Sequence, residues 1–279
     1  DEVFHRELFD YLECNFSPKV EKNLHRIRTF PWLEDTEFTV DRIADNDQPC
    51  CVRMLSASGM DQDRLLDVLT LFINGGSTAG RVAACEALAK IPGEKSNQLF
   101  IANIHDEDPQ VQAAVALQLR DRHIAGTMAV LVKLLDSPHG IVREAARESL
   151  SEFSYENFVK QFETLHEESR KTTGSLVKKV DLELKFKLAA DLRSQSRRTR
   201  MRTIEITEAL ECVGEVSDVM IEMLEDSDHL VRAAVASALQ YCPTPEVRAA
   251  LEEATHDKSS AVQSAARGSL EVFASINLA

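Results

Sequence analysis

The stretch PHGIVREAARESL, residues 138–150, decides the fold of this chain because its pattern recurs along the sequence. Counted from Val142, apolar or small residues occupy offsets 0, +3, +4, +7 and +8, which lie on one face of an α-helix. With few exceptions, the same offsets are filled alike in VQAAVALQL (111–119), VRAAVASAL (231–239) and VQSAARGSL (262–270). The pattern predicts a recurring helix that packs through small side chains.

Each recurring helix follows a helix rich in Leu, Val and Ile, so the repeating unit is a helical hairpin. The predicted first and second helices are 61–73 and 78–91, 97–104 and 108–119, 126–136 and 139–153, 182–194 and 197–210, 216–226 and 230–241, and 245–257 and 261–274. The residues at offset 0 are Gly80, Val111, Val142, Arg200, Val231 and Val262, with a step of 31 residues except between Val142 and Arg200, where it is 58.

One hairpin cannot bury its apolar face alone, so the hairpins must stack on one another. We therefore predict an all-α fold, an α-solenoid in which about six or seven antiparallel helical hairpins form a curved superhelix. Its expected parts are an irregular helical N-terminal cap (1–60), a first repeat block (61–153), an irregular long helix with a connector (154–180) and a second repeat block (181–279).

The irregular parts carry their own expectations. In the N-terminal cap we predict a helix over 1–16 and a second helix that begins at Pro18 with Ser17 as its N-cap. The only tryptophan, Trp32, is expected to plug the end of the stack. In the middle of the chain we predict one long helix over 155–171, followed by a loop at Gly174.

The loops before the second helices are rich in aspartate, which suits helix N-capping. These residues are Asp106, Asp108, Asp136, Asp226, Asp228 and Asp257. Long polar side chains recur at offset +1, as in Arg81, Arg143 and Arg232. Stacked repeats place them in a ladder, where they either pair with aspartates of neighbouring loops or contact a ligand.

The stretches DSPHGIVREAARESL (136–150), DSDHLVRAAVASAL (226–239) and DKSSAVQSAARGSL (257–270) resemble the HEAT-repeat family. The short step is similar to the compact bacterial, phycobilisome-lyase-like variety. The resemblance covers about residues 61–153 and 181–275. It implies an α-solenoid, and it implies little about function because such repeats serve many roles.

Composition narrows the function classes. The net charge of −14 argues against a protein that grips nucleic acid through its phosphates. No run approaches eighteen apolar residues, so we expect no membrane span. The six cysteines show no metal-binding spacing and are expected to be free thiols in a reducing cytoplasm. Because the sequence starts at Asp1 without Met, we expect it to be a fragment of a longer chain.

No enzyme signature is present: the phosphate-binding, zinc-protease and serine-hydrolase motifs are all missing. HEAT-like hydroxylases hold two irons with several His-Glu dyads, whereas this chain has only His166-Glu167. HEAT-like DNA glycosylases need a cationic face with aromatic side chains, which the overall charge and the position of Trp32 do not favour. We therefore expect no catalytic residue, no metal and no cofactor.

Residues 160–202 depart from the acidic character of the chain, with twelve basic and six acidic residues. The segment carries a charge of +6 against −20 elsewhere. Cations at the start of a helix oppose its dipole, so local stability does not explain those that open the helix 197–210. Two interpretations remain open: pairing with acidic neighbouring repeats or another copy, or docking of an acidic or phosphorylated protein partner.

These observations favour a non-catalytic, cytoplasmic scaffold or adaptor that binds a protein partner on its concave surface and on the local basic patch. Candidate partner-binding residues are Lys178, Lys179, Arg193, Arg197, Arg198, Arg200 and Arg202 in the basic segment, and Arg147, Glu148, Glu205, Ser237 and Arg267 on second helices. The alternative is a nucleic-acid-binding or DNA-glycosylase-like HEAT protein that uses the basic segment.

Overall fold

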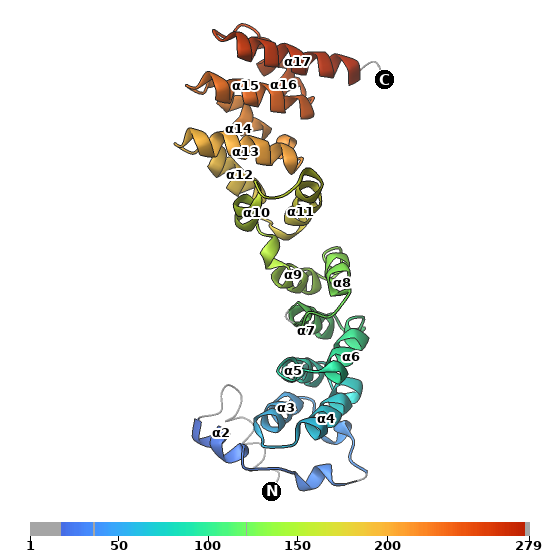
Figure 1. Cartoon of the computed structure of the whole chain (residues 1–279). Helices are drawn as coiled ribbons and strands as arrows, with labels where there is room; N and C mark the ends of the chain where they lie inside the picture. Colours follow the sequence, from blue (N-terminus) through green and yellow to red (C-terminus); the bar gives the residue numbers. More distant parts are fainter. Residues whose placement is uncertain (1–17, 36, 121, 277–279) are drawn as a thin grey trace. The chain divides into compact units, whose positions relative to one another are not determined.

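The computed structural model describes residues 18–35, 37–120 and 122–276 of the chain, without the side chain of residue 276. Within these ranges all regular elements are helices and no strand occurs, which confirms the predicted all-α fold (Figure 1). The chain divides into two compact units, Asp1–Leu150 and Ser151–Ala279.

The first unit consists of helical hairpins arranged in two layers (Figure 1). Its α-helices are α2 (Pro18–Leu24), α3 (Gln48–Ala57), α4 (Gln62–Gly75), α5 (Thr78–Ala89), α6 (Glu94–Asn103), α7 (Pro109–Leu119), α8 (Thr127–Leu134) and α9 (Gly140–Ser149). Helices α3, α5, α7 and α9 stack on one another in one layer, and α4, α6 and α8 form the other layer. The predicted hairpins are therefore present.

Small side chains at offsets +3 and +4 permit this stacking. In α9 these positions hold Ala145 and Ala146, both buried against α7. The leucines at offset +8 fill the space behind them: Leu88, Leu119 and Leu150 are at most 1% exposed. A leucine buried to this extent contributes about 2 kcal/mol to the free energy of unfolding.

The stack begins before the first predicted repeat, because α3 packs on α5 as α5 packs on α7. Gln48 of α3 is 1% exposed; its amide donates to the Ile43 carbonyl (3.2 Å) and accepts from the Ser77 backbone N–H (2.7 Å). A Cβ atom at position 80 would lie 2.3 Å from this amide oxygen. The repeat therefore has Gly80 where the other second helices have a larger residue at offset 0.

Two predictions for the N-terminal cap meet the structure. Helix α2 spans Pro18–Leu24 among the described residues, whereas the predicted helix over 1–16 and the expected N-cap Ser17 lie outside them. Trp32 lies in a short 3₁₀ turn, where its ring contacts those of Phe30 and Phe38 at centroid distances of 5.8 and 5.0 Å. These contacts agree with a packing role.

The second unit has the same two-layer arrangement. Its α-helices are α10 (Tyr155–Gln161), α11 (Glu167–Val180), α12 (Leu184–Leu192), α13 (Arg197–Ala209), α14 (Ser217–Glu222), α15 (His229–Ala238), α16 (Pro245–Ala254) and α17 (Ser260–Ile276). Helices α13, α15 and α17 stack in one layer, and α12, α14 and α16 lie against them.

The single long helix predicted over 155–171 is wrong. Helix α10 ends at Gln161, and α11 begins at Glu167. At the break, Arg170 turns back: its Nε donates to the Phe162 carbonyl at 2.8 Å, and its guanidinium lies 4.2 Å from the centroid of the Phe162 ring. At this corner the Phe162 carbonyl therefore accepts a hydrogen bond from a side chain rather than from a backbone N–H of a continuing helix.

The loop predicted at Gly174 is also wrong, because this residue is buried inside α11. A Cβ atom there would lie 2.9 Å from Leu210 Cδ2 and 3.6 Å from the Ala209 carbonyl oxygen. Glycine thus permits α11 to approach the end of α13 closely. Residues 154–180, predicted to form one long helix and a connector, therefore form the two helices α10 and α11.

A polar network holds α10 and α11 to α12. The buried carboxylate of Asp181 accepts from the Tyr155 backbone N–H (3.0 Å) and from Lys187 Nζ (2.8 Å). Lys187 also pairs with Glu156 (2.9 Å), and the Tyr155 hydroxyl donates to Asp191 (2.8 Å). Burial and this carboxylate raise the pKa of Tyr155. Here polar contacts add to the apolar packing of Phe158, Val177 and Leu188.

The register of α13 differs from the prediction by one residue. In α15, which begins at His229, the residue at offset 0 is the third of the helix, Val231. Helix α13 begins at Arg197, so its third residue is Thr199, and Arg200 takes offset +1. The steps on either side of α13 are therefore 57 and 32 residues.

Candidate functional site

The loop edge of the second helices carries a ladder of Arg–Asp pairs. Its rungs are Arg81–Asp106 at 2.6 Å in the first unit, and Arg200–Asp226 and Arg232–Asp257, both at 2.8 Å, in the second. In each rung an arginine at offset +1 reaches the aspartate in the loop before the next second helix. Of the two interpretations of these arginines, this geometry supports pairing.

Each aspartate of the ladder also organises its own loop. The carboxylate of Asp226 accepts from the Asp228 backbone N–H at 2.8 Å, and that of Asp257 accepts from the Ser259 N–H at 2.7 Å. The Arg232 guanidinium and the Ser259 N–H hold the pKa of Asp257 below its ordinary value. Asp228 then caps α15 by accepting from the Leu230 N–H, as Asp108 does for α7. The ladder is therefore a structural device.

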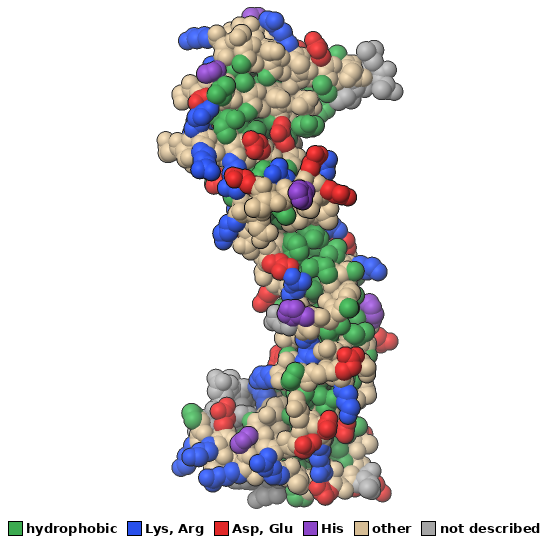
Figure 2. Space-filling model, viewed as in Figure 1, with side chains coloured by type: hydrophobic (Ala, Val, Ile, Leu, Met, Phe, Trp, Pro, Cys, Tyr) green, Lys and Arg blue, Asp and Glu red, His purple; other side chains and the backbone are tan. Residues whose placement is uncertain are grey.

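Much of the basic segment is engaged in ion pairs within the second unit. Arg193 pairs with Glu222 (2.9 Å), and Arg197 pairs with Asp228 (2.6 Å). Arg202 occupies offset +3, where the other repeats have alanine; it donates to the Val159 carbonyl and lies 3.5 Å from Glu163. Over α12–α14, Figure 2 shows basic side chains beside acidic ones.

The other candidates in the basic segment, Lys178, Lys179 and Arg198, are exposed. Lys178 and Lys179 lie in the last turn of α11, and Arg198 lies in the first turn of α13. The positive charges of Lys178 and Lys179 are favourable there, because the C-terminal end of the helix dipole is negative. The structure does not bring the seven candidates together as one free cationic surface, and their contact with a partner stays a prediction.

The candidates on second helices share two offsets. Glu148, Glu205 and Ser237 occupy offset +6 of α9, α13 and α15, and all three are exposed. Arg147 and Arg267 occupy offset +5; Arg267 is exposed and Arg147 is half-buried. Burial, together with the charge of Glu205, raises the pKa of the neighbouring Glu208. Of these candidates, Glu148 of α9 lines a hollow in the first unit.

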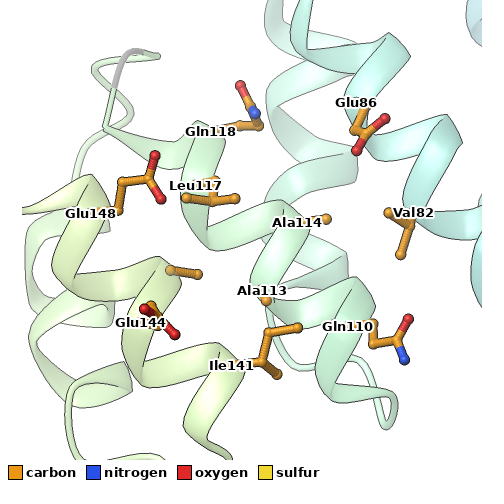
Figure 3. A pocket seen from close by; sticks show the side chains of 11 residues that line it. Val82, Glu86, Gln110, Ala113, Ala114, Leu117, Gln118, Ile141, Glu144 and Glu148 are labelled. Carbon is orange, nitrogen blue, oxygen red and sulfur yellow. The ribbon is translucent and has the colours of Figure 1, made fainter. Parts of the chain in front are cut away.

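A hollow of about 330 Å³ lies in the first unit across the three successive second helices α5, α7 and α9 (Figure 3). Its lining residues are Val82, Glu86, Gln110, Ala113, Ala114, Leu117, Gln118, Ile141, Glu144, Ala145 and Glu148. They occupy offsets −1, +2, +3, +6 and +7, mostly those that stacking leaves free. In Figure 3, Val82 and Glu86 face Glu144 and Glu148 across α7.

The hollow combines apolar surface with carboxylates. Alanines of α7 and α9 leave the space, and Val82, Leu117 and Ile141 supply apolar walls. Ile141 is 50% exposed and lies beside the apolar surface of Leu117 and the alanines of α7. Glu86, Glu144 and Glu148 add three carboxylates, and the lining contains no Lys or Arg.

The sequence analysis singled out Glu148 and missed Glu86, Glu144 and Ile141. A signal for them was present in the sequence. Glu86 occupies offset +6, Glu144 offset +2 and Ile141 offset −1, and stacking uses none of these offsets. Projecting every offset that stacking does not use would have placed them on one face.

The other side chains that could react or bind a metal lie at structural positions. Cys50, Cys51, Cys85, Cys212 and Cys242 are buried free thiols, and Cys14 lies outside the described residues. Burial raises the pKa of Cys51 and Cys85 to about 12 and that of Cys212 to about 11. His166 precedes α11 as its N-cap residue. In the described ranges, no three or more His, Cys, Asp or Glu side chains are grouped to hold a metal ion. Nor does any described helix have the length and apolarity to cross a membrane.

Comparisons with known proteins agree with the repeat pattern. Among solved structures, an engineered protein is 18% identical over 75% of this chain and 96% of its own, with a TM-score of 0.31. Human deoxyhypusine hydroxylase in complex with glycerol is 13% identical over 81% of this chain and 97% of its own, with a TM-score of 0.33. No curated protein sequence matches. A family model of HEAT repeats matches residues 65–151 and 187–271, more than half of the chain. The chain therefore belongs to the HEAT-repeat family.

Proposed function

We propose that the chain is a non-catalytic scaffold that binds a protein partner on the second-helix face of its first unit. The observation that carries this proposal is the hollow across α5, α7 and α9, where apolar side chains remain exposed beside carboxylates. Stacked helical repeats serve protein binding through such extended surfaces. Covering a half-exposed isoleucine is worth about 1 kcal/mol, so a partner gains from contact here.

The proposal also covers a second contact, the compartment and the variety of the repeat. The exposed cations Lys178, Lys179 and Arg198 supply a second contact for an acidic or phosphorylated part of the partner. The buried thiols suit a reducing cytoplasm. The 31-residue step supports the short bacterial, phycobilisome-lyase-like variety of the repeat.

The test replaces Ile141 with Gln, which removes exposed apolar surface without changing charge. Ile101→Gln on α6 is a matched control, because Ile101 is also 50% exposed and lies in the other layer of the same unit. Proteins that copurify with each purified variant are quantified by mass spectrometry. We expect a partner that wild type and Ile101→Gln retain and Ile141→Gln loses. Equal retention by all three proteins would show that the hollow is not the binding surface.

The nucleic-acid alternative is less favoured, because Arg193, Arg197, Arg200 and Arg202 already contact acidic side chains. Retention on immobilised DNA at increasing salt tests it. We expect elution at low salt that Arg198→Glu does not change. Salt-resistant retention that Arg198→Glu abolishes would favour the alternative over the scaffold.

A further inference from the structure

The three carboxylates of the hollow are not explained by the stability of the fold. Glu144 and Glu148 are four residues apart on α9, and like charges at this spacing cost a few tenths of a kcal/mol. Within the described residues, neither of them nor Glu86 forms an ion pair or a side-chain hydrogen bond. Most other carboxylates near second helices, such as Asp106, have a cation or an N–H as a partner. No ion pair or hydrogen bond within the described residues therefore explains why these three positions carry a carboxylate.

The acidic character of the chain as a whole does not explain them either. In α15 of the second unit, the residues equivalent to Glu144 and Glu148 are Ala233 and Ser237. In α17 they are Ser264 and Gly268. In α13 of the second unit, offset +6 holds Glu205 but offset +2 holds Met201. Among the second helices, glutamate at both offsets therefore occurs only in α9 of the first unit.

The spacing of the carboxylates defines the length of an occupant. Glu86 and Glu148 share offset +6 on α5 and α9, which lie on either side of α7 in one stack. Packed helices lie about 8–10 Å apart, so the two carboxylates are separated by roughly 20 Å. That distance corresponds to about 13 residues of helix or six of extended chain. Between them, Leu117 and Ile141 offer apolar surface to the middle of such a segment.

We propose that the hollow binds a basic amphipathic segment of a protein partner. Its Lys or Arg side chains meet Glu86, Glu144 and Glu148, and its apolar side chains cover Ile141 and Leu117. Charge complementarity selects this occupant, since the lining is formally −3 and holds no cation. The inference rests on the proposed function and adds the chemistry of the partner to it.

The experiment uses two fluorescent 16-residue peptides as probes, with identical leucines and with either lysine or glutamate on the polar face. Binding to the full chain is followed by anisotropy at fixed salt. Glu86→Gln/Glu144→Gln/Glu148→Gln removes the three carboxylates. The matched control is Glu246→Gln/Glu252→Gln/Glu253→Gln, which makes the same change of net charge at exposed positions of α16. Circular dichroism is used to check that both variants are folded.

We expect the lysine peptide to bind wild type, the glutamate peptide not to bind, and the triple change in the hollow to weaken binding about 10-fold. The α16 control should stay within about two-fold of wild type. Equal weakening by both triple variants would reduce the effect to overall charge and overturn the proposal. Binding of both peptides alike would also overturn it.

The outcome is separable from that of the proposed function. If Ile141→Gln loses a natural partner but the three Glu→Gln changes do not, the scaffold surface stands and the basic partner is wrong. If neither set of changes loses a partner, both proposals fail. Sedimentation of the chain alone covers another occupant: self-association abolished by the three changes would identify a second copy of this chain and overturn the basic segment.

Discussion

The second helices of the two units bury side chains at the same offsets, but they carry different residues at some of the exposed offsets. Leu150, which follows α9, and Leu239, which follows α15, are both fully buried at offset +8, and Ile141 and Leu230 are 50% and 45% exposed at offset −1. At offsets +2 and +6, however, α9 has two glutamates where α15 has alanine and serine. Packing therefore determines the residues that stack, and the offsets it leaves free are where the two units differ in what they offer a partner.

The largest expected effect comes from giving the first repeat of the first unit the valine that Val111 and Val142 of the same unit and Val231 of the second unit have at offset 0. Gly80→Val introduces the residue that Val231 supplies in α15, yet it should lower the free energy of unfolding by about 3 kcal/mol, because overpacking of a filled site costs this much. The new Cβ would meet the Gln48 amide oxygen at 2.3 Å and its Cβ at 2.9 Å. Urea unfolding with amide exchange of α3 and α5 measures the loss.

Its control is the double variant Gly80→Val/Gln48→Ala, which clears the space. We expect it to be more stable than Gly80→Val alone, although the Ser77 N–H loses its acceptor. If Gly80→Val is neutral, Gln48 does not fix the glycine, and the first unit tolerates the residue that the other repeats use.

The next effect tests whether the ladder of the second unit is structural. Arg200→Ala should lower the free energy of unfolding by about 2 kcal/mol, because the side chain of Asp226 is only 10% exposed and loses its cation. Arg197→Ala, one turn earlier on the same helix, should cost about 0.5 kcal/mol, since that arginine is 52% exposed. Chemical unfolding of both variants gives the comparison. Equal losses would mean that burial does not separate the two pairs.

A third prediction moves the charge of the first unit to the second. In a chain that carries Glu86→Gln, Glu144→Gln and Glu148→Gln, the added changes Ala233→Glu and Ser237→Glu recreate the α9 pattern on α15. We expect affinity for the lysine peptide to rise about five-fold, or about 1 kcal/mol, beside the exposed Leu230. Anisotropy measures it. No gain would show that carboxylates at these offsets do not suffice and that the hollow itself is required.

The sequence predicted the hairpins well because stacking repeats one demand, small residues at +3 and +4 and a leucine at +8, in nearly every unit. It failed at α10 and α11 and in the register of α13, because other contacts hold the chain there. Gly174 looks like a loop residue until Leu210 is seen against it, and Arg202 stands where the other repeats have alanine because α10 supplies its acceptor. Such pairings join residues far apart in the chain, so no local pattern reveals them.

The smallest predicted effect asks whether a missing rung can be built in the first unit. Ser137 occupies the place of Asp106 one repeat later, and its hydroxyl accepts from the His139 N–H as that aspartate accepts from the Asp108 N–H. Gln112 stands where the preceding repeat has Arg81. Gln112→Arg/Ser137→Asp should therefore raise the free energy of unfolding by about 0.5 kcal/mol, the usual value of a partly exposed pair.

A double-mutant cycle measures this coupling and separates it from the single changes. Gln112→Arg alone gives up the bond from Gln112 Nε2 to the Ile104 carbonyl, and Ser137→Asp alone adds a negative charge beside Asp136. Both single variants should thus be neutral or slightly destabilised, and only the pair should gain. Zero coupling would mean that a rung needs more than an arginine at offset +1 and an aspartate in the next loop, so the ladders of the two units would differ by more than two side chains.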